Sequence, residues 1–278
     1  MDREEQLVFC KQCVNRKLDM QQGLVCDLTG KKADFVDSCD NFEREKGIID
    51  QQKDRIQLVR PNKQRAVIAQ TFVWAVMIVD MISAHSSYLQ YNLLIALQDN
   101  EYVSDEMLDS NDTREQLVAI VYLIVFIISI VTFIQWFRRA YYNLGIRKKT
   151  EHAEGWAAGC WFVPIISLYW PYKIMKEMWV GTNELIRAKT TEPVNKATGI
   201  IGVWWAAWII SNYIGNYFFK SSFNTDTIED LLSSTQADLF LSIIGIPLAI
   251  ITVMIIKQYS FKEEKLRELE RSSLPANE

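Results

Sequence analysis

Five long apolar stretches divide the sequence, and their lengths predict an integral membrane protein. They cover residues 66–84, 117–137, 155–172, 197–219 and 239–256. Each is close to the roughly 20 residues that an α-helix needs to cross the hydrocarbon layer of a bilayer. We therefore expect an all-α integral membrane fold built from these stretches.

The polar segments between and beyond the stretches set the other boundaries. The expected parts are a small N-terminal module (1–46), a juxtamembrane linker (47–65), the membrane domain (66–257) and a charged tail (258–278). The formal net charge of −4 is small, and its basic and acidic residues are segregated, which argues against nucleic acid as a partner. Membrane lipid is the partner that this composition predicts.

Lysine and arginine residues near the stretches predict the side that each loop faces. Basic clusters precede the first stretch and follow the second, third and fifth stretches, whereas the loops after the first and fourth stretches are acidic. Because Lys and Arg near span ends mark the cytoplasmic side, both termini are expected in the cytoplasm. Four crossings satisfy this pattern, formed by all the stretches except the third.

The third stretch (155–172) is expected to enter the membrane or its interface without crossing it. Pro164 and Pro171 each remove a helical hydrogen bond, and Trp156 and Trp161 are aromatic residues of the kind that settle at headgroup depth. Non-helical backbone at membrane depth needs cover from protein or a water-filled cavity, so we expect this re-entrant element to pack inside the bundle. A short, proline-kinked fifth span stays open as the alternative.

The segment after it (173–187) has the pattern of an amphipathic helix. Ile174, Met178 and Trp179 recur at helical spacing, while Lys173 and Lys176 take the other face. Such a helix is typical of one that lies flat on lipid headgroups.

Four of the five cysteines form a cluster that is typical of a metal site. Cys10, Cys13, Cys26 and Cys39 follow the pattern C-x2-C-x12-C-x12-C. Four thiolates complete a tetrahedral, structural zinc site, and so short a segment needs such a cross-link because it cannot bury a sufficient core. Iron is the less favoured metal, redox-active or unliganded thiols stay open, and two disulfides would require an oxidising compartment. The expected small core consists of Phe9, Leu24, Phe35 and Phe42.

Polar residues inside the apolar stretches are the other candidate site residues. Asp80 is a functional-site candidate because intramembrane carboxylates are costly, unless it belongs to the outer headgroup zone. Asn212 and Asn216 share one helix face, which favours helix packing over a permeation path. A cluster of tryptophans on the same stretch is expected to face lipid or the interface: Trp204, Trp205 and Trp208.

The sequence carries little catalytic chemistry. It contains no P-loop, nucleophile elbow or His-Glu-x-x-His motif. Glu151, His152 and Glu154 form a small polar group before the third stretch. An enzyme is therefore the less favoured interpretation.

Two adjoining parts of the membrane domain carry recognisable elements. These elements are FIQWFRRAYYNL (133–144), GW (155–156), WFVP (161–164) and WPY (170–172). They resemble the bacterial membrane-protein family called domain of unknown function 4328, which implies a polytopic protein without an established activity. Ser167 departs from the asparagine expected before the second proline. The cysteine run is similar to a module that precedes membrane segments in some Bacteroidetes proteins, which implies a separable metal-binding unit.

We therefore expect a multi-pass protein of the bacterial inner membrane. The leading hypothesis is a regulatory or scaffolding protein whose zinc module docks a cytoplasmic protein partner. The alternatives are an ion channel or small-solute transporter, and a membrane-interface enzyme acting on lipid. The sequence leaves a homo-oligomer open.

Overall fold

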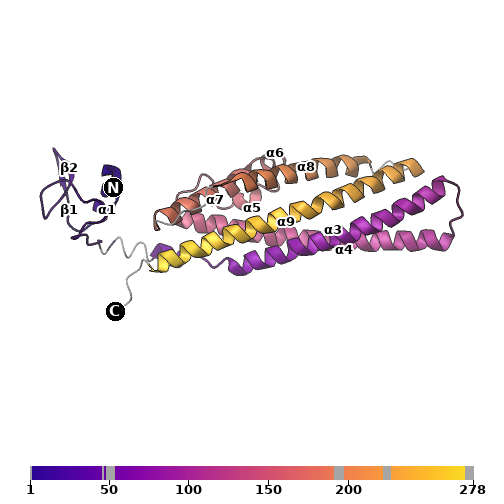
Figure 1. Ribbon diagram of the computed structural model, residues 1–278, viewed down its shortest axis with the longest axis horizontal. Helices are drawn as coiled ribbons and strands as arrows, with labels where there is room; N and C mark the ends of the chain where they lie inside the picture. Colours follow the sequence, from indigo (N-terminus) through magenta and orange to yellow (C-terminus); the bar gives the residue numbers. More distant parts are fainter. Residues whose placement is uncertain (1, 46, 48–53, 191–196, 222–226, 273–278) are drawn as a thin grey trace. The chain divides into compact units, whose positions relative to one another are not determined.

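The computed structural model describes residues 2–45, 47, 54–190, 197–221 and 227–272. The chain divides into two compact units (Figure 1). One comprises Met1–Val59 with Glu270–Glu278, and the other comprises Arg60–Leu269.

The N-terminal unit contains one short helix and one β-hairpin. Helix α1 (Arg3–Cys10) begins at a capping box, in which the Glu5 N–H donates to Asp2 Oδ1 and the Asp2 N–H donates to Glu5 Oε2. Strands β1 (Arg16–Asp19) and β2 (Gly23–Cys26) pair antiparallel, with Arg16 opposite Cys26.

Aromatic contacts confirm part of the core expected in this unit. The Phe9 ring packs edge-on against Phe35 and Phe42, with centroids 6.0 and 5.8 Å away. Among the described residues of this unit, however, the buried apolar residues are Cys13 and Val25. The unit therefore has only a minimal hydrophobic core.

The second unit is helical. Its elements are α3 (Lys63–Gln98), α4 (Asp105–Arg147), α5 (Trp156–Gly159), α6 (Pro164–Ser167), α7 (Trp170–Arg187), α8 (Gly199–Ser221) and α9 (Ile228–Ser272). Helices α3 and α4 pack together as a hairpin. Asn100 takes a positive φ of 58° in the connection, and the Ser104 side chain caps α4 by accepting from the Met107 N–H.

Three of the described helices are long and apolar enough to cross a membrane: α3, α4 and α9. In the most apolar part of α4 only 6% of the residues are buried within the protein. So much exposed apolar surface is unusual in a soluble protein and is what a lipid-facing helix requires. The prediction of an all-α fold with membrane-spanning helices is thus supported at this level. Helix α8 is not among these three helices, and a count of four crossings stays a prediction.

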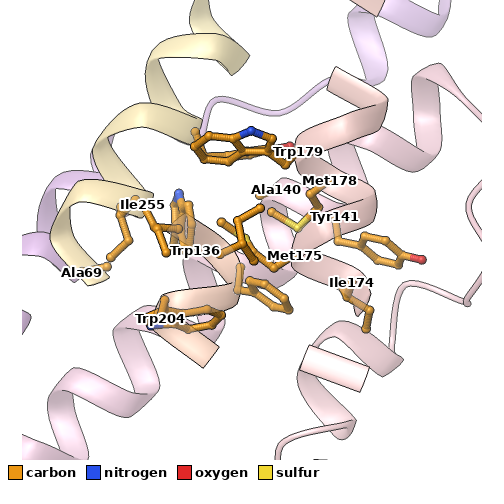
Figure 2. Packing of buried hydrophobic residues seen from close by; sticks show 14 of the residues in the cluster. Ala69, Trp136, Ala140, Tyr141, Ile174, Met175, Met178, Trp179, Trp204 and Ile255 are labelled. Atoms are coloured by element: carbon orange, nitrogen blue, oxygen red, sulfur yellow. The ribbon is translucent and has the colours of Figure 1, made fainter. Parts of the chain in front are cut away.

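The hydrophobic core of the second unit brings together residues of α3, α4, α7, α8 and α9. Figure 2 shows Trp136, Ala140 and Tyr141 of α4 beside Met178 and Trp179 of α7. All five side chains are at most 2% exposed. This core contains much of the stretch 133–144, so the recognisable sequence elements are mainly packing residues.

The segment 155–172 is not one helix, and its packing corrects the expectation above. Ala157 and Cys160 are fully buried, but Phe162 is 72% and Ile165 is 84% exposed. The tip of the segment therefore faces outward instead of packing inside the bundle. Its backbone is satisfied locally, because tight turns bond Phe162 N–H to the Gly159 carbonyl and Ser167 N–H to the Val163 carbonyl.

Helix α7 forms where the amphipathic segment predicted it, but its apolar face meets protein. Ile174, Met175, Met178 and Trp179 are buried in the core. The prediction that this face rests on lipid headgroups is wrong, because the helices around it supply the apolar surface.

The tryptophans of α8 also differ from expectation. Trp204 and Trp205 are buried, and Trp208 packs against the same core. The Trp161 ring lies within 6.5 Å, between centroids, of each of these three rings. These tryptophans therefore anchor the segment 155–172 to α8 instead of facing lipid.

Candidate functional site

Asp80 is buried where three helices meet. Its side chain on α3 is only 4% exposed and forms a hydrogen bond with the Tyr122 hydroxyl of α4. On α9, Gly245 makes room for it, since a Cβ there would lie 2.6 Å from Asp80 Oδ2. The carboxylate therefore occupies space that any side chain larger than hydrogen at position 245 would fill.

A polar network lies two helical turns from Asp80. Ser86 donates to Glu115 Oε1 at 2.6 Å, and the Arg114 guanidinium donates to Ser86 Oγ at 2.9 Å. The same guanidinium bonds Asn111 Oδ1 at 2.6 Å. Because Ser86 lies on α3 and the others on α4, this network fastens the two helices beyond the level of Asp80.

Asn212 and Asn216 do not join the Asp80 site. Both side chains are exposed on α8, and their amides donate to carbonyls of the same helix, those of Trp208 and Asn212, at 2.9 Å. Neither amide is used to bond a neighbouring helix in this arrangement. The expectation that this pair packs helices through amide bonds across a seam is not what the structure shows.

The residues singled out in the segment 155–172 pack against neighbouring rings or begin helices. Trp161 is the centre of the aromatic contacts with α4 and α8. Pro164 and Pro171 lie in the first turns of α6 and α7, where a missing N–H costs no helical bond. Trp156 packs edge-on against Trp170 with centroids 4.7 Å apart.

The loop before this segment is held by Glu177 of α7. Glu177 Oε2 accepts from the Tyr141 hydroxyl at 2.8 Å, and Oε1 accepts from the Glu151 N–H at 2.8 Å. The Tyr141 hydroxyl also accepts from the His152 N–H at 3.1 Å. The His152 ring stacks on Trp170, with centroids 4.3 Å apart. The polar group predicted from Glu151, His152 and Glu154 therefore lies in a loop that hydrogen bonds and ring stacking hold against α4 and α7.

These motif positions agree with a comparison at the level of families. A family model described as Domain of unknown function (DUF4328) matches residues 99–260, which is more than half of the chain. The chain belongs to this family. No curated protein and no solved structure matches it.

The DUF4328 region contains the partners of Asp80 but not Asp80 itself. Tyr122 and Gly245 lie inside residues 99–260, whereas α3 precedes them. The family resemblance expected from the elements in 133–172 is confirmed. The similarity of the cysteine run to a module of some Bacteroidetes proteins stays a prediction.

A second buried carboxylate, Glu263, was missed by the sequence analysis because it lies in the segment assigned to a charged tail. Asn143 of the DUF4328 region donates to Glu263 Oε1 at 2.5 Å, and Asn62 donates to Oε2 at 3.1 Å. Asn143 also pairs with the Arg60 backbone, donating to its carbonyl at 2.8 Å and accepting from its N–H at 3.0 Å. The available signal was spacing: Glu263 follows Tyr259 by four residues and thus continues the buried face of α9.

The four cysteines ahead of the DUF4328 region all carry free thiols. Burial raises the pKa of the Cys10 thiol; Arg3 lowers it, and the charges of Cys13, Cys39 and Cys26 raise it further, so the four lie within electrostatic reach of one another. In the described part of the chain, no three His, Cys, Asp or Glu side chains are arranged to hold a metal ion. A zinc site therefore stays a prediction.

Proposed function

We propose that this DUF4328 protein is a regulatory or scaffolding protein of the bacterial inner membrane, whose N-terminal zinc module docks a cytoplasmic protein partner. The observation that carries the proposal is the separation of a small four-thiol unit from an apolar helical unit. The helical unit supplies the membrane anchor, and the small unit supplies the surface that a partner would bind.

Zinc suits the chemistry of the donor set. Cys10, Cys13, Cys26 and Cys39 would hold the ion as thiolates, and the ion would supply a cross-link between the end of α1, the end of β2 and the chain after it. The reason for needing it is the minimal core, since binding free energy of a structural metal becomes folding free energy.

An exposed apolar pair on the hairpin supports docking. Leu18 is 73% exposed on β1, and Met20 in the following turn is 97% exposed. Exposed apolar residues in a cluster are typical of protein–protein contacts. The β-hairpin would present this pair to the partner.

The membrane arrangement proposed for the helical unit has four crossings, with α8 as the one beyond α3, α4 and α9. The segment 155–172 would be re-entrant or interfacial, and its exposed Phe162 and Ile165 would contact lipid. Single cysteines placed at Lys149 and Lys189 should both resist a membrane-impermeant thiol reagent in intact cells, while one at Asp105 should react. Labelling at Lys189 but not Lys149 would mean a fifth crossing.

The zinc module is tested on the purified full-length protein. We expect about one zinc per chain by elemental mass spectrometry, lost in Cys26→Ser and retained in the matched control Cys160→Ala, whose thiol is buried in the helical unit. Metal-free protein with two disulfides would contradict the zinc module.

Docking is tested in cells with a photo-cross-linking residue at Leu18. We expect an adduct with one protein, identified by mass spectrometry and reproduced when the cross-linker is placed in that partner. The adduct should disappear in the Cys26→Ser background. The same residue placed at Ile124 on the apolar face of α4 is the control. Adducts that are equal at both positions, or unchanged by Cys26→Ser, would contradict docking through the module.

Transport and lipid chemistry are the remaining alternatives. Of these two alternatives, the buried carboxylate of Asp80 favours ion transport over an enzyme that acts on lipid. The pair Asn212 and Asn216 adds nothing to a permeation path, because both face outward from the core.

A further inference from the structure

Polar residues at the junction of α3, α4 and α9 form successive levels along the helices. The inner level consists of Asp80, Tyr122 and Gly245, which are in mutual contact through the Asp80 carboxylate. A second level lies seven residues away on each helix, toward the ends that join α3 to α4: Ser87, Glu115 and Asp238. Seven residues are almost two turns, so each pair shares a helix face and is about 10 Å apart.

More polar residues lie about one turn beyond the second level, and Glu115 is linked to them through Arg114. Arg114, which forms an ion pair with Glu115 at 3.3 Å, bonds Asn111 of the preceding turn. Gln90 of α3 donates to Thr235 Oγ1 of α9 at 3.2 Å. Asp238 is close enough to Glu115 for their charges to interact. Polar groups therefore continue past the second level on all three helices, as far as Gln90, Asn111 and Thr235.

Two hydroxyl groups lie between the second level and Asp80. Ser83 follows Asp80 by three residues on α3 and is half-buried, and Ser242 precedes Gly245 by three residues on α9 and is buried. A hydroxyl group both donates and accepts hydrogen bonds. The interval between the levels thus contains groups that can pass a proton along a hydrogen-bonded chain with water.

We propose that Asp80 is a proton-exchange site that communicates with the outer side of the membrane through these levels. A proton from outer water adds to one carboxylate oxygen of Asp80 to give the neutral acid, and the same O–H bond breaks on release. The Tyr122 hydroxyl keeps its own proton and donates a hydrogen bond to the ionised form. This inference goes beyond docking by the N-terminal module and does not depend on zinc.

The surroundings of Asp80 distinguish an exchange site from a purely structural carboxylate. Within the described residues, Tyr122 is the hydrogen-bond donor to Asp80, and no lysine or arginine forms an ion pair with it. A buried ionised carboxylate with so little compensation is costly. The ionisable groups nearest along the three helices are His85 on α3, Glu115 with its neighbour Arg114 on α4, and Asp238 on α9. Protonation removes the cost at Asp80, and deprotonation restores it.

The test is an infrared pH titration of the full-length protein in lipid vesicles, which records the C=O band of protonated carboxyl groups. The difference between the wild type and Asp80→Asn isolates Asp80. We expect a band that is present at low pH, declines as pH rises and is missing from Asp80→Asn. A wild-type spectrum equal to that of Asp80→Asn at every pH, or a difference band that no pH change alters, would overturn the proposal. A difference band that responds to sodium at constant pH would also overturn it, in favour of a cation site.

A second variant keeps the test decisive if Asp80→Asn does not fold. Tyr122→Phe retains the carboxylate but removes its donor, so the ionised form loses stabilisation and the acid band should persist to higher pH by about one unit or more. An unchanged titration in Tyr122→Phe would contradict the proposed arrangement.

The outer route is tested by the rate at which the band responds to a pH jump outside the vesicles. Glu115→Gln should slow the response several-fold, because it removes a proton-accepting group from the second level. Asp109→Asn is the matched control, since Asp109 is an exposed acid on the same helix. Equal rates in the wild type and both variants would exclude this route.

Discussion

Asp80 and Glu263 are both buried carboxylates of the helical unit, and they are held in different ways. Glu263 accepts hydrogen bonds from two amides, those of Asn62 and Asn143. Asp80 accepts a hydrogen bond from the Tyr122 hydroxyl and fills the space beside Gly245, which has no side chain. Burial raises the pKa of Glu263, and the hydrogen bonds from Asn143 and Asn62 oppose that rise. Two amides, one on α4 and one at the start of α3, also fix the position of the carboxylate, whereas Asp80 has a single hydroxyl donor. The comparison favours a structural role for Glu263 and is consistent with the exchange role proposed for Asp80.

The DUF4328 region supplies partners to both carboxylates. Asn143, Tyr122 and Gly245 lie inside residues 99–260, while Asp80 precedes the matched residues and Glu263 follows them. The matched region thus contacts one acidic side chain from α3, Asp80, and another from the C-terminal part of α9, Glu263.

Asn143→Ala should produce the largest loss of stability. The substitution removes a donor from Glu263 and leaves the Arg60 N–H and carbonyl without the partner they have now. A buried group left unsatisfied costs about 1–3 kcal/mol, which applies to Glu263 in full, while water can partly replace Asn143 at the exposed Arg60. We therefore expect a total loss of about 3–5 kcal/mol. Denaturation of the purified protein in detergent measures it. A loss below about 0.5 kcal/mol, the range of neutral surface changes, would show that Glu263 is not held as described.

Gly245→Ala should have a smaller effect and should act on Asp80. The new methyl group would meet the carboxylate at 2.6 Å, and such overpacking costs about 1–3 kcal/mol. Gly202→Ala on α8 is the matched control, because a Cβ there meets nothing within 4 Å. This control should stabilise the protein by up to about 1 kcal/mol, since alanine favours helix more than glycine does. The two variants should therefore change stability with opposite signs, and equal signs would contradict the close approach of Asp80 to α9.

The sequence made the helices predictable where apolar residues were continuous, and it identified Asp80 as a candidate because one acid stands out within such a stretch. It could not show that α7 buries its apolar face, because periodicity defines a face without defining what covers it. Trp204 and Trp205 were misassigned for the same reason. Glu263 was hidden among the charges of the last segment, since burial there depends on Asn62 and Asn143, which are distant in sequence.

Asn212→Ala should have the smallest effect of the three substitutions. Its amide bonds the Trp208 carbonyl within α8, and its side chain is exposed, so no buried partner is left unsatisfied when it is removed. Alanine also has a higher helix propensity than asparagine, and exposed substitutions of this kind fall within about ±0.5 kcal/mol. The same detergent denaturation measures it, beside Asn143→Ala as the buried asparagine for comparison. A loss as large as that of Asn143→Ala would mean that Asn212 bonds another surface, either a second copy of the chain or a partner helix. In that case a buried hydrogen bond of Asn212 would stabilise an interface on α8, as the hydrogen bonds of Asn62 and Asn143 stabilise Glu263.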